Sequence, residues 1–322
     1  MVCKIYNESL VPVGAVSSYI SLVWSEQFCD IGSAQLVCTK NNKILELLKL
    51  GYFIGIDDSE TLMRIHSIPD RKDQIWVYAT EAKSELSNHI LRGSYEFNGN
   101  IDKVIFDKLR GESLPKWLEF DENQLPYFVN SVQTFRDYNS ITQTFCKENN
   151  CGYTFIFKNQ KLYFSIYDGK HNESIILSDK LGNIANVERT TTDQNAKNFA
   201  IVKVNDDYWI EVDRTEGNER RELIVDASDL GQEDGSITAY HERLTTRGVE
   251  ALEKTKKSDE YKFDVKENIF DRGLKLGDIV SANFSEYNIT KKVRIEGFSI
   301  TFENHTKKIN LTIGENIKGD NQ

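Results

Sequence analysis

Histidine, cysteine and proline are scarce in this sequence of 322 residues, which has 5 histidines, 5 cysteines and 4 prolines. The cysteines are odd in number and form no CxxC pair, so we expect buried, small apolar side chains rather than a disulfide framework or a zinc site. No apolar run approaches the roughly 20 residues of a transmembrane helix, and residues 1–7 are too polar for a signal peptide. We therefore expect a protein that is made and kept in a cytoplasm.

An excess of positive charge is also missing. The 50 acidic and 40 basic residues give a formal net charge of -10, which argues against a protein whose main task is to grip nucleic-acid phosphates. Basic residues around Arg220 and Lys256 are interspersed with acidic ones and form no patch of a single sign. With 39% hydrophobic and 28% charged residues, the composition is typical of a globular protein rather than a disordered one.

Motifs that carry catalysis are lacking as well. His241 begins a sequence like that of zinc proteases, but Thr245 stands where the second histidine is required. Asp168, His171 and Glu173 are interpreted as a polar turn rather than a metal or acid–base site. We interpret two acidic groups in the same way, as a hairpin tip rather than a calcium site (Asp57, Asp58, Glu60) and as a solvated helix face (Glu250, Glu253). We therefore expect no enzyme, no cofactor and no metal.

The pattern of apolar residues predicts many short strands and a few helices. Strict alternation marks strands through most of the first hundred residues and again from residue 184. Asn41 or Asn42 caps one helix, and Asp137 caps another, which precedes strands 153–158 and 161–168 joined by an Asn159-Gln160 turn. Segments 81–89 and 100–109 are helix-like, and Ser236 opens a long helix that ends near Lys256. The fold is expected to be α+β and mainly β.

Three groups of motifs, taken in order, resemble a known family. The first is Ser21–Ser25 with Gly32–Cys38 and a hairpin through Leu62–Ile65, the second is the helix and hairpin of Tyr138–Gly169, and the third is Leu276–Val280 with a strand pair that ends at Gly314. Their order and spacing are similar to those of the tail-hub proteins of long-tailed bacteriophages and prophages. These proteins form the structural module at the start of many tail-associated lysins.

The resemblance implies two β-barrel domains that are similar to the tail-tube protein. They would occupy residues 1–95 and 181–322, the second including a long helix at 236–256, with a helical connector at 96–125 and a helix-plus-hairpin insertion at 126–180. Three copies would form a baseplate hub, a ring that adapts the sixfold tail tube to the threefold tail tip. The ring would form part of a DNA channel with an acidic lumen, and the chain would be the hub without the enzyme.

The resemblance also implies partners and a location. The homotrimer would contact the distal tail protein, the tail tube protein, the tape measure protein, a tail-tip fibre or lysin and, passively, genomic DNA, but no membrane. It would be assembled in the bacterial cytoplasm and reside in the virion tail.

Two other functions stay open from the residues alone. One is a tail-tip peptidoglycan hydrolase, since catalytic carboxylates can assemble from distant parts of a chain. The other is a carbohydrate-binding adhesion module that uses Trp117 or Trp209 as a stacking platform. Trp24, Phe28 and Phe284 are expected in packing or subunit contacts, with packing in the core preferred.

Overall fold

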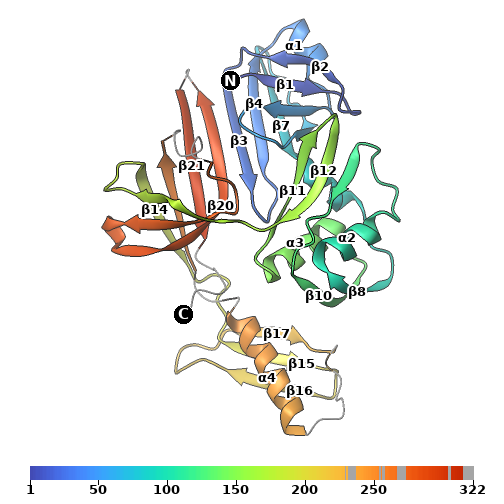
Figure 1. The fold of residues 1–322 in the computed structure, drawn as a ribbon, viewed down its shortest axis with the longest axis vertical. Helices are drawn as coiled ribbons and strands as arrows, with labels where there is room; N and C mark the ends of the chain where they lie inside the picture. Colours follow the sequence, from blue (N-terminus) through green and yellow to red (C-terminus); the bar gives the residue numbers. More distant parts are fainter. Residues whose placement is uncertain are drawn as a thin grey trace. The chain divides into compact units, whose positions relative to one another are not determined.

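The computed structural model describes residues 1–228, 230, 237–253, 255, 258–266, 273–303 and 306–314. The protein is mainly β, as the sequence predicts, and divides into two compact units (Figure 1). The first unit comprises Met1–Glu188 and Tyr261–Gln322, and the second comprises Arg189–Glu260. No helix among the described residues is long and apolar enough to cross a membrane.

A sheet of 13 strands dominates the first unit and combines strands from early and late parts of the sequence. Its main path runs in the order β14-β18-β21-β20-β3-β4-β7-β6-β5-β1-β2, and β19 pairs with both β20 and β13. The strands are β1 Cys3–Tyr6, β2 Pro12–Val16, β3 Ser21–Gln27, β4 Ser33–Thr39, β5 Phe53–Ile56, β6 Met63–Ser67, β7 Gln74–Glu81, β13 His171–Ser178, β14 Ile184–Thr192, β18 Ser258–Val265, β19 Ile279–Phe284, β20 Ile289–Glu303 and β21 Thr306–Gly314.

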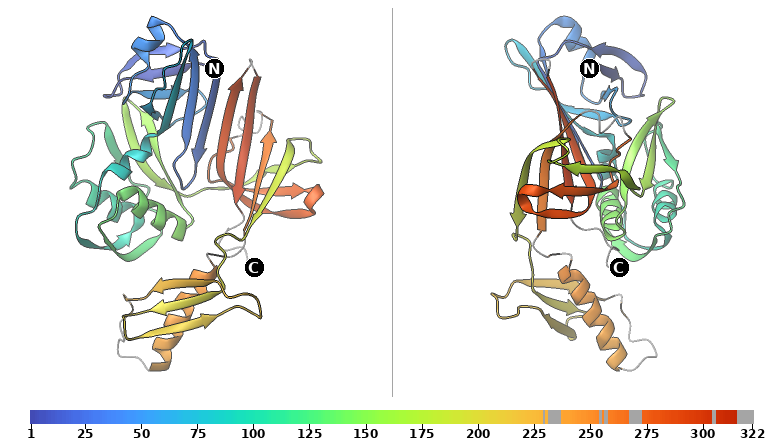
Figure 2. Two further views of the ribbon diagram at one scale, coloured as in Figure 1. Left: turned by 180° about the vertical axis from the view of Figure 1, so that it is seen from behind. Right: turned by 60° about the vertical axis from the view of Figure 1, so that its left-hand side comes forward.

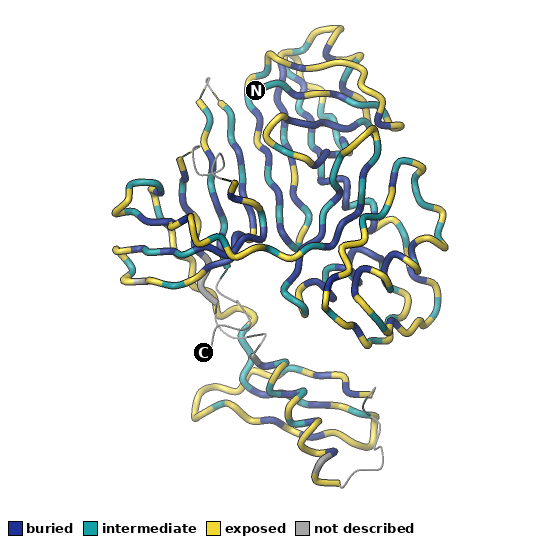
Figure 3. The backbone as a smooth tube through the Cα atoms, viewed as in Figure 1, coloured by how far each residue is buried: buried dark blue, intermediate teal, exposed yellow. Residues whose placement is uncertain are grey.

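The pairing of β3 with β20 joins the two regions expected to be barrels. Residues 21–27 lie antiparallel to residues 297–303, and the left-hand view of Figure 2 shows the blue strand β3 next to the red strand β20. One hydrophobic cluster lies beneath these strands and contains residues from both regions, among them Trp24, Leu36, Ile300 and Leu311. The alternation of apolar and polar residues favours this shared core, because every second side chain of a strand points to the same face of the sheet. Figure 3 shows the alternation as changing colour along the central strands of the sheet, such as β3 and β7.

Short helices in the first unit begin where the sequence predicts. Helix α1 (Asn42–Leu47) is capped by Asn41, whose Oδ1 accepts a hydrogen bond of 3.0 Å from the Ile44 amide. The helix-like segment 81–89 is a 3-10 helix, η1 (Ala82–Asn88), and a second one, η2 (Ser285–Tyr287), follows β19. These findings confirm the helix predicted at Asn41 or Asn42 and select Asn41 as its cap.

A module within the first unit is built around a second hydrophobic cluster, to which the large sheet and its loops also contribute Leu10, Phe53 and Leu62. It contains α2 (Ile101–Leu109), α3 (Tyr138–Glu148), and the strands β8 Ser94–Asn100, β9 Leu118–Asp121, β10 Phe128–Thr134, β11 Gly152–Lys158 and β12 Lys161–Tyr167. Asp137 caps α3 by accepting a 2.8 Å hydrogen bond from the Ser140 amide, and both Asn159 and Gln160 have positive φ angles, which a tight hairpin turn requires. The predicted helix and hairpin are confirmed.

This module contains strands and helices from both the expected connector, 96–125, and the expected insertion, 126–180. Strand β8 pairs with β10, and β9 pairs in parallel with β12. Each pair joins segments that lie tens of residues apart, so that the two ranges have a common core. Local patterning could identify the helices in these ranges, but it contains no information about such pairing.

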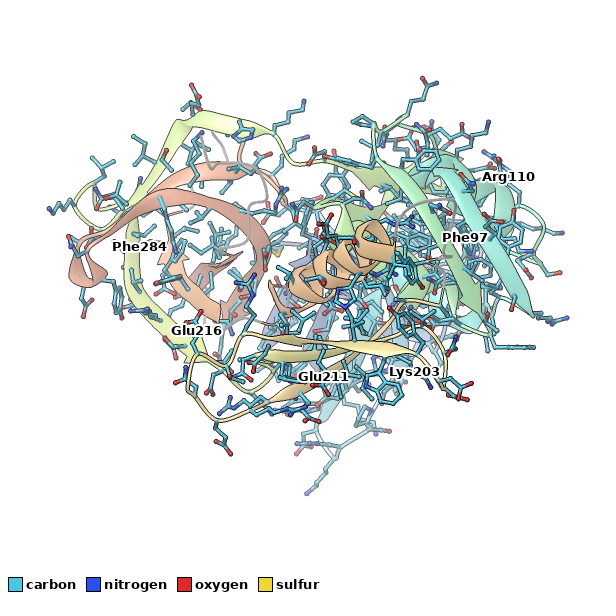
Figure 4. All side chains as sticks on the ribbon, turned by 90° about the horizontal axis from the view of Figure 1, so that it is seen from below. Phe97, Arg110, Lys203, Glu211, Glu216 and Phe284 are labelled. Atoms are coloured by element: carbon cyan, nitrogen blue, oxygen red, sulfur yellow. The ribbon has the colours of Figure 1, made fainter. Side chains whose placement is uncertain are left out.

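The second unit is a three-stranded sheet covered on one face by a helix. Strands β15 (Phe199–Lys203), β16 (Trp209–Asp213) and β17 (Glu222–Asp226) form the sheet, and α4 (Ile237–Glu253) packs on it. Lys203 and Glu211 lie on the face away from α4 (Figure 4). These strands lie in range 181–322, which was expected to be the second barrel, but they form a separate three-stranded sheet. The helix supplies a covering face, with Tyr240, Leu244 and Leu252 buried, so that the strands have a local core. The predicted cap Ser236 lies outside the described residues.

Candidate functional site

One face of the large sheet is almost free of charge. Four adjacent strands, β20, β3, β4 and β7, each present four residues on this face, as their antiparallel register shows. The face residues, which we call the uncharged face, are Gly297, Ser299, Thr301 and Glu303 on β20, Ser21, Val23, Ser25 and Gln27 on β3, Ser33, Gln35, Val37 and Thr39 on β4, and Gln74, Trp76, Tyr78 and Thr80 on β7. Glu303 is the one charged residue among them, although charged residues make up 28% of the chain.

The uncharged face is accessible, whereas the opposite side of the same strands is buried. Apart from Val37 and Gly297, its residues are half-buried or exposed. The Ser25 hydroxyl is held by the backbone of the neighbouring strand: its Oγ donates to the Ser33 carbonyl at 3.2 Å and accepts from the Ser33 amide at 3.1 Å. Within the face, Trp76 Nε1 donates to Gln74 Oε1 at 3.2 Å. The surface therefore offers short hydroxyl and amide groups that are held in place, rather than mobile charged side chains.

Charged residues lie on the strands that border the uncharged face on either side. On β21, Lys308 lies opposite Thr301, and on β6, Arg64 lies opposite Thr80. The Arg64 Nη1 atom lies 3.2 Å from Glu85 Oε2. The four central strands thus form a neutral band that is bordered by charged strands.

A buried ionic cluster lies at the end of this sheet. The Lys83 ammonium lies 3.1 Å from Glu81 Oε2 and donates to the carbonyls of Gln27, at 2.7 Å, and Tyr153, at 3.2 Å. The side chains of Lys83 and Glu81 are 1% and 2% exposed. Because Tyr153 belongs to β11 and Gln27 to β3, Lys83 connects the module to the large sheet.

Burial changes the acidity of the carboxyl groups in this cluster. Removal from water raises the pKa of Glu81 to about 7, although Lys83 and the Gly32 amide, which donates to Glu81 Oε2, both favour the charged form. Burial likewise raises the pKa of Glu26, and the Trp24 indole opposes this shift by donating to Glu26 Oε1 at 2.7 Å. The cluster is therefore sensitive to pH in the range where Glu81 titrates.

Phe28 fills a tight junction between three segments of the first unit. A Cβ atom on Gly152 or Gly277 would lie 2.3 Å from a ring carbon of Phe28, so only glycine fits at either position. The Arg294 guanidinium lies over the ring, 5.0 Å from its centroid, and Arg294 Nη1 donates to the Gly277 carbonyl at 3.0 Å. Phe28 is 4% exposed and packs β3 against the starts of β11 and β19.

Trp24 and Phe284 are also buried inside this chain. Both have an exposed fraction of 0%, and both belong to the hydrophobic cluster beneath the large sheet. The Phe284 ring stacks on Tyr261, with a centroid distance of 5.3 Å. The two side chains contribute to packing within the chain.

The other candidate residues are distributed over separate contacts. Asp168 accepts a 2.5 Å hydrogen bond from Tyr127, whereas His171 begins β13 and Glu173 is exposed on it. Asp57 pairs with Lys4 at 2.7 Å and Asp58 with Lys307 at 2.9 Å. Thr245 donates to the His241 carbonyl. Among the described residues, no three His, Cys, Asp or Glu side chains are placed to hold a metal ion.

The two tryptophans considered as stacking platforms differ in exposure. Trp117 packs edge-on against Phe53 with a centroid distance of 5.6 Å, and Trp209 on β16 is 50% exposed. Trp117 is half-buried, so Trp209 has the more exposed ring of the two.

The uncharged face is not predicted by the sequence patterns taken strand by strand. The signal was present in the strand patterns, because the outward-facing polar positions of segments 21–27, 33–39, 74–80 and 297–303 are serine, threonine, glutamine and tyrosine, with Glu303 as the one charged exception. Recognising it required the pairing of β3 with β20, which brings distant segments into one surface.

Solved structures with this fold include tail and baseplate proteins and a component of the E. coli type VI secretion system. The tail protein from Neisseria meningitidis MC58 has a TM-score of 0.65 and 10% sequence identity, and the alignment covers 98% of this chain and 96% of that protein. The prophage MuSo2 43 kDa tail protein from Shewanella oneidensis has a TM-score of 0.63 and 11% identity, with coverages of 97% and 98%. A chain of the phage P2 baseplate has a TM-score of 0.54 and 11% identity, with both chains covered completely. These likenesses establish the fold.

Sequence comparison gives the family. A search of curated proteins found no match. A family model described as Siphovirus ReqiPepy6 Gp37-like protein matches residues 2–315. The chain therefore belongs to the Siphovirus ReqiPepy6 Gp37-like protein family.

Proposed function

We propose that this chain is a structural hub of a bacteriophage or phage-like tail and performs no catalysis. Three copies form a ring in the virion tail that adapts the sixfold tail tube to the threefold tip. Membership of a siphovirus protein family and a fold similar to that of phage tail and baseplate proteins support this proposal.

The observation that carries the proposal is the uncharged face. A protein that holds DNA presents lysine and arginine to the phosphates, and release of counterions then gives strong binding. A channel through which a genome slides requires the opposite, a wall with few cations. None of the strand residues of the uncharged face is a lysine or arginine, and among the described contacts the one cation found over it is the Arg71 guanidinium, 4.4 Å from the centroid of the Trp76 ring. The face supports a role as the wall of a DNA channel.

This assignment modifies the expectation of an acidic lumen. The formal charge of -10 per chain gives -30 for three copies (3 × -10), but Glu303 is the one carboxylate on the uncharged face. We propose a neutral wall, with most of the negative charge elsewhere on the chain. A neutral polar wall neither binds the phosphates nor repels them over long distances.

The edges of the large sheet are candidate surfaces for contacts between copies in the ring and with partner proteins. Strands β2 and β14 end the strand order of the large sheet within the described residues, so their outer edges offer backbone groups to a neighbouring copy. We propose the distal tail protein, the tail tube protein, the tape measure protein and a tail-tip fibre or lysin as partners. Assembly would take place in the host cytoplasm.

The oligomer tests this proposal. We expect the purified chain to form trimers in light scattering and to appear in electron microscopy as threefold rings with a hole wide enough for duplex DNA. A compact monomer at all concentrations, or a closed oligomer without a hole, would overturn the hub. Incubation with peptidoglycan is expected to release no fragments, and release that persists after repurification would favour a hydrolase.

A further inference from the structure

The second unit exposes one face of its three-stranded sheet. Helix α4 packs on the inner face, and alternate residues of each strand point to the opposite face (Figure 4). The residues that we call the outer face are Phe199, Ile201 and Lys203 on β15, Trp209, Glu211 and Asp213 on β16, and Glu222, Ile224 and Asp226 on β17. All of them except Phe199 and Ile201 are exposed.

Apolar side chains lie together across the middle of the outer face. Ile224 is 71% exposed, Trp209 is 50% exposed, and Ile201 on the central strand is half-buried. Ile201 and Ile224 are direct partners across β15 and β17, and Trp209 lies diagonally across from Ile201, within reach of a large ring. Strand positions that face water normally carry polar residues, so this continuous apolar group indicates a surface that another molecule buries.

Acidic residues flank the apolar group on both outer strands, namely Glu211 and Asp213 on β16 and Glu222 and Asp226 on β17. The cations of the same surface already have carboxylate partners. Lys203 Nζ lies 2.6 Å from Asp206 Oδ1, and Arg220, whose guanidinium covers the Phe199 ring, places Nε 2.8 Å from Glu222 Oε1. The borders of the outer face are therefore acidic, and they are complementary to a partner with basic borders.

The dimensions of the outer face fit one α-helix. Each of the three strands has five residues, which corresponds to a length of about 17 Å, and the two outer strands lie about 10 Å apart. A helix with its side chains is about 10–12 Å wide. On the inner face of the same sheet, α4 alone provides the cover. A second helix on the outer face would bury the apolar group between three layers.

We propose that the outer face binds an amphipathic helix of another protein, with lysine or arginine along both borders of its apolar stripe. The stripe packs on Ile201, Ile224 and Trp209, and the basic residues pair with Glu211 on one border and Asp226 on the other. The outer face is separate from the uncharged face, and this binding does not rest on the proposed ring. A chain that failed to form trimers would test it equally well.

Titration of the purified chain with a synthetic peptide tests the proposal. The probe is a peptide of about 18 residues with leucine and lysine at helical spacing, because much shorter helices are marginal in water. We expect calorimetry to detect binding that weakens with added salt, and hydrogen exchange to slow within residues 199–226 but not within 94–134. A peptide with glutamate in place of lysine should bind at least about tenfold more weakly, because like charges then meet.

Variants of exposed residues separate the apolar and the charged contributions. Ile224→Asp should weaken binding of the lysine peptide at least about tenfold, since it places a charge at the centre of the contact. The double variant Glu211→Lys with Asp226→Lys should lose the lysine peptide and bind the glutamate peptide instead. The matched controls are Phe128→Asp and Glu96→Lys, which change an exposed apolar and an exposed acidic residue of the first unit and should leave the affinity unchanged.

Several outcomes would overturn the proposal. Equal affinity for the two peptides, or slowed exchange within 94–134 alone, would exclude the outer face as the site. A change in the oligomeric state of the free chain with Ile224→Asp would assign the face to a second copy. Slowed exchange within 199–226 with a chitin oligosaccharide, but not with the lysine peptide, would assign it to a glycan. The exchange measurements use the unmodified chain, so they decide the matter even if a variant fails to fold.

Discussion

Replacing Lys83 by methionine tests the buried ionic cluster. The ammonium is paired with Glu81 and bound to two carbonyls in a site that excludes water. Removing one partner of such a pair leaves an uncompensated buried charge, which costs about 3–5 kcal/mol. We therefore expect the free energy of unfolding of the first unit to fall by about that amount at about pH 8.

The cost of this substitution is expected to depend on pH. The pKa of Glu81 rises from an ordinary value of 4.5 to about 7 with Lys83 in place, and loss of the neighbouring cation raises it further. When folding raises the pKa of a carboxyl group, that group contributes its full stabilisation at pH values below its pKa in the unfolded state. The contribution is lost as the pH rises through its pKa in the folded state. A shift of this size corresponds to about 3 kcal/mol. At about pH 5 Glu81 is protonated, so most of the cost of Lys83→Met should disappear.

Urea unfolding followed by tryptophan fluorescence measures both effects, since Trp24, Trp76 and Trp117 belong to the first unit. The matched control is Lys161→Met, because Lys161 also contacts a carboxylate, Glu119 at 2.7 Å, and a carbonyl, but at the surface. That variant is expected to lose less than about 1 kcal/mol at either pH. A cost for Lys83→Met that equals the control, or that is the same at both pH values, would refute the reasoning.

Other predictions concern the Phe28 junction, a helix cap and the uncharged face. Phe28→Ala should lower the free energy of unfolding by about 3–5 kcal/mol in urea titrations, since it leaves a cavity beside Gly152 and Gly277, and a loss below about 1 kcal/mol would contradict the junction. Asp137→Ala should cost about 1 kcal/mol by thermal unfolding, and no change would mean that the cap of α3 is dispensable. In assembled particles, Ser25→Lys should slow DNA release in a salt-dependent manner. The control variant Leu45→Lys, on the exposed part of α1, should not slow it. Equal rates of DNA release from the two variants would exclude the uncharged face as the wall of the channel.

Elements that depend on neighbouring residues could be predicted from the sequence. The cap at Asp137, the turn at Asn159-Gln160 and the helix after Asn41 each rest on contacts within four residues, and the structure contains all three. Such features express local hydrogen bonding and backbone geometry, which the residue type largely determines.

Features that depend on distant residues could not be predicted in this way. The ionic cluster contains Glu26, Glu81 and Lys83, whose side chains look like ordinary surface charges in an alternating sequence. The second unit could not be predicted either, because its strands alternate apolar and polar residues as the strands of the large sheet do. Only the pairing of β15 with β16 and β17 distinguishes its sheet from the large one. Tertiary contacts, rather than local propensity, decide both cases.

The pairing of β3 with β20 has a consequence for synthesis on the ribosome. Strand β3 emerges early, but its partner at residues 297–303 emerges after two compact segments have been made. Until then one side of β3 is an open edge above an incomplete core, which is the kind of surface that invites wrong pairing with another nascent chain. Completion of the large sheet is therefore a late event in translation, because β3 lacks one of its two neighbouring strands until residues 297–303 have been made.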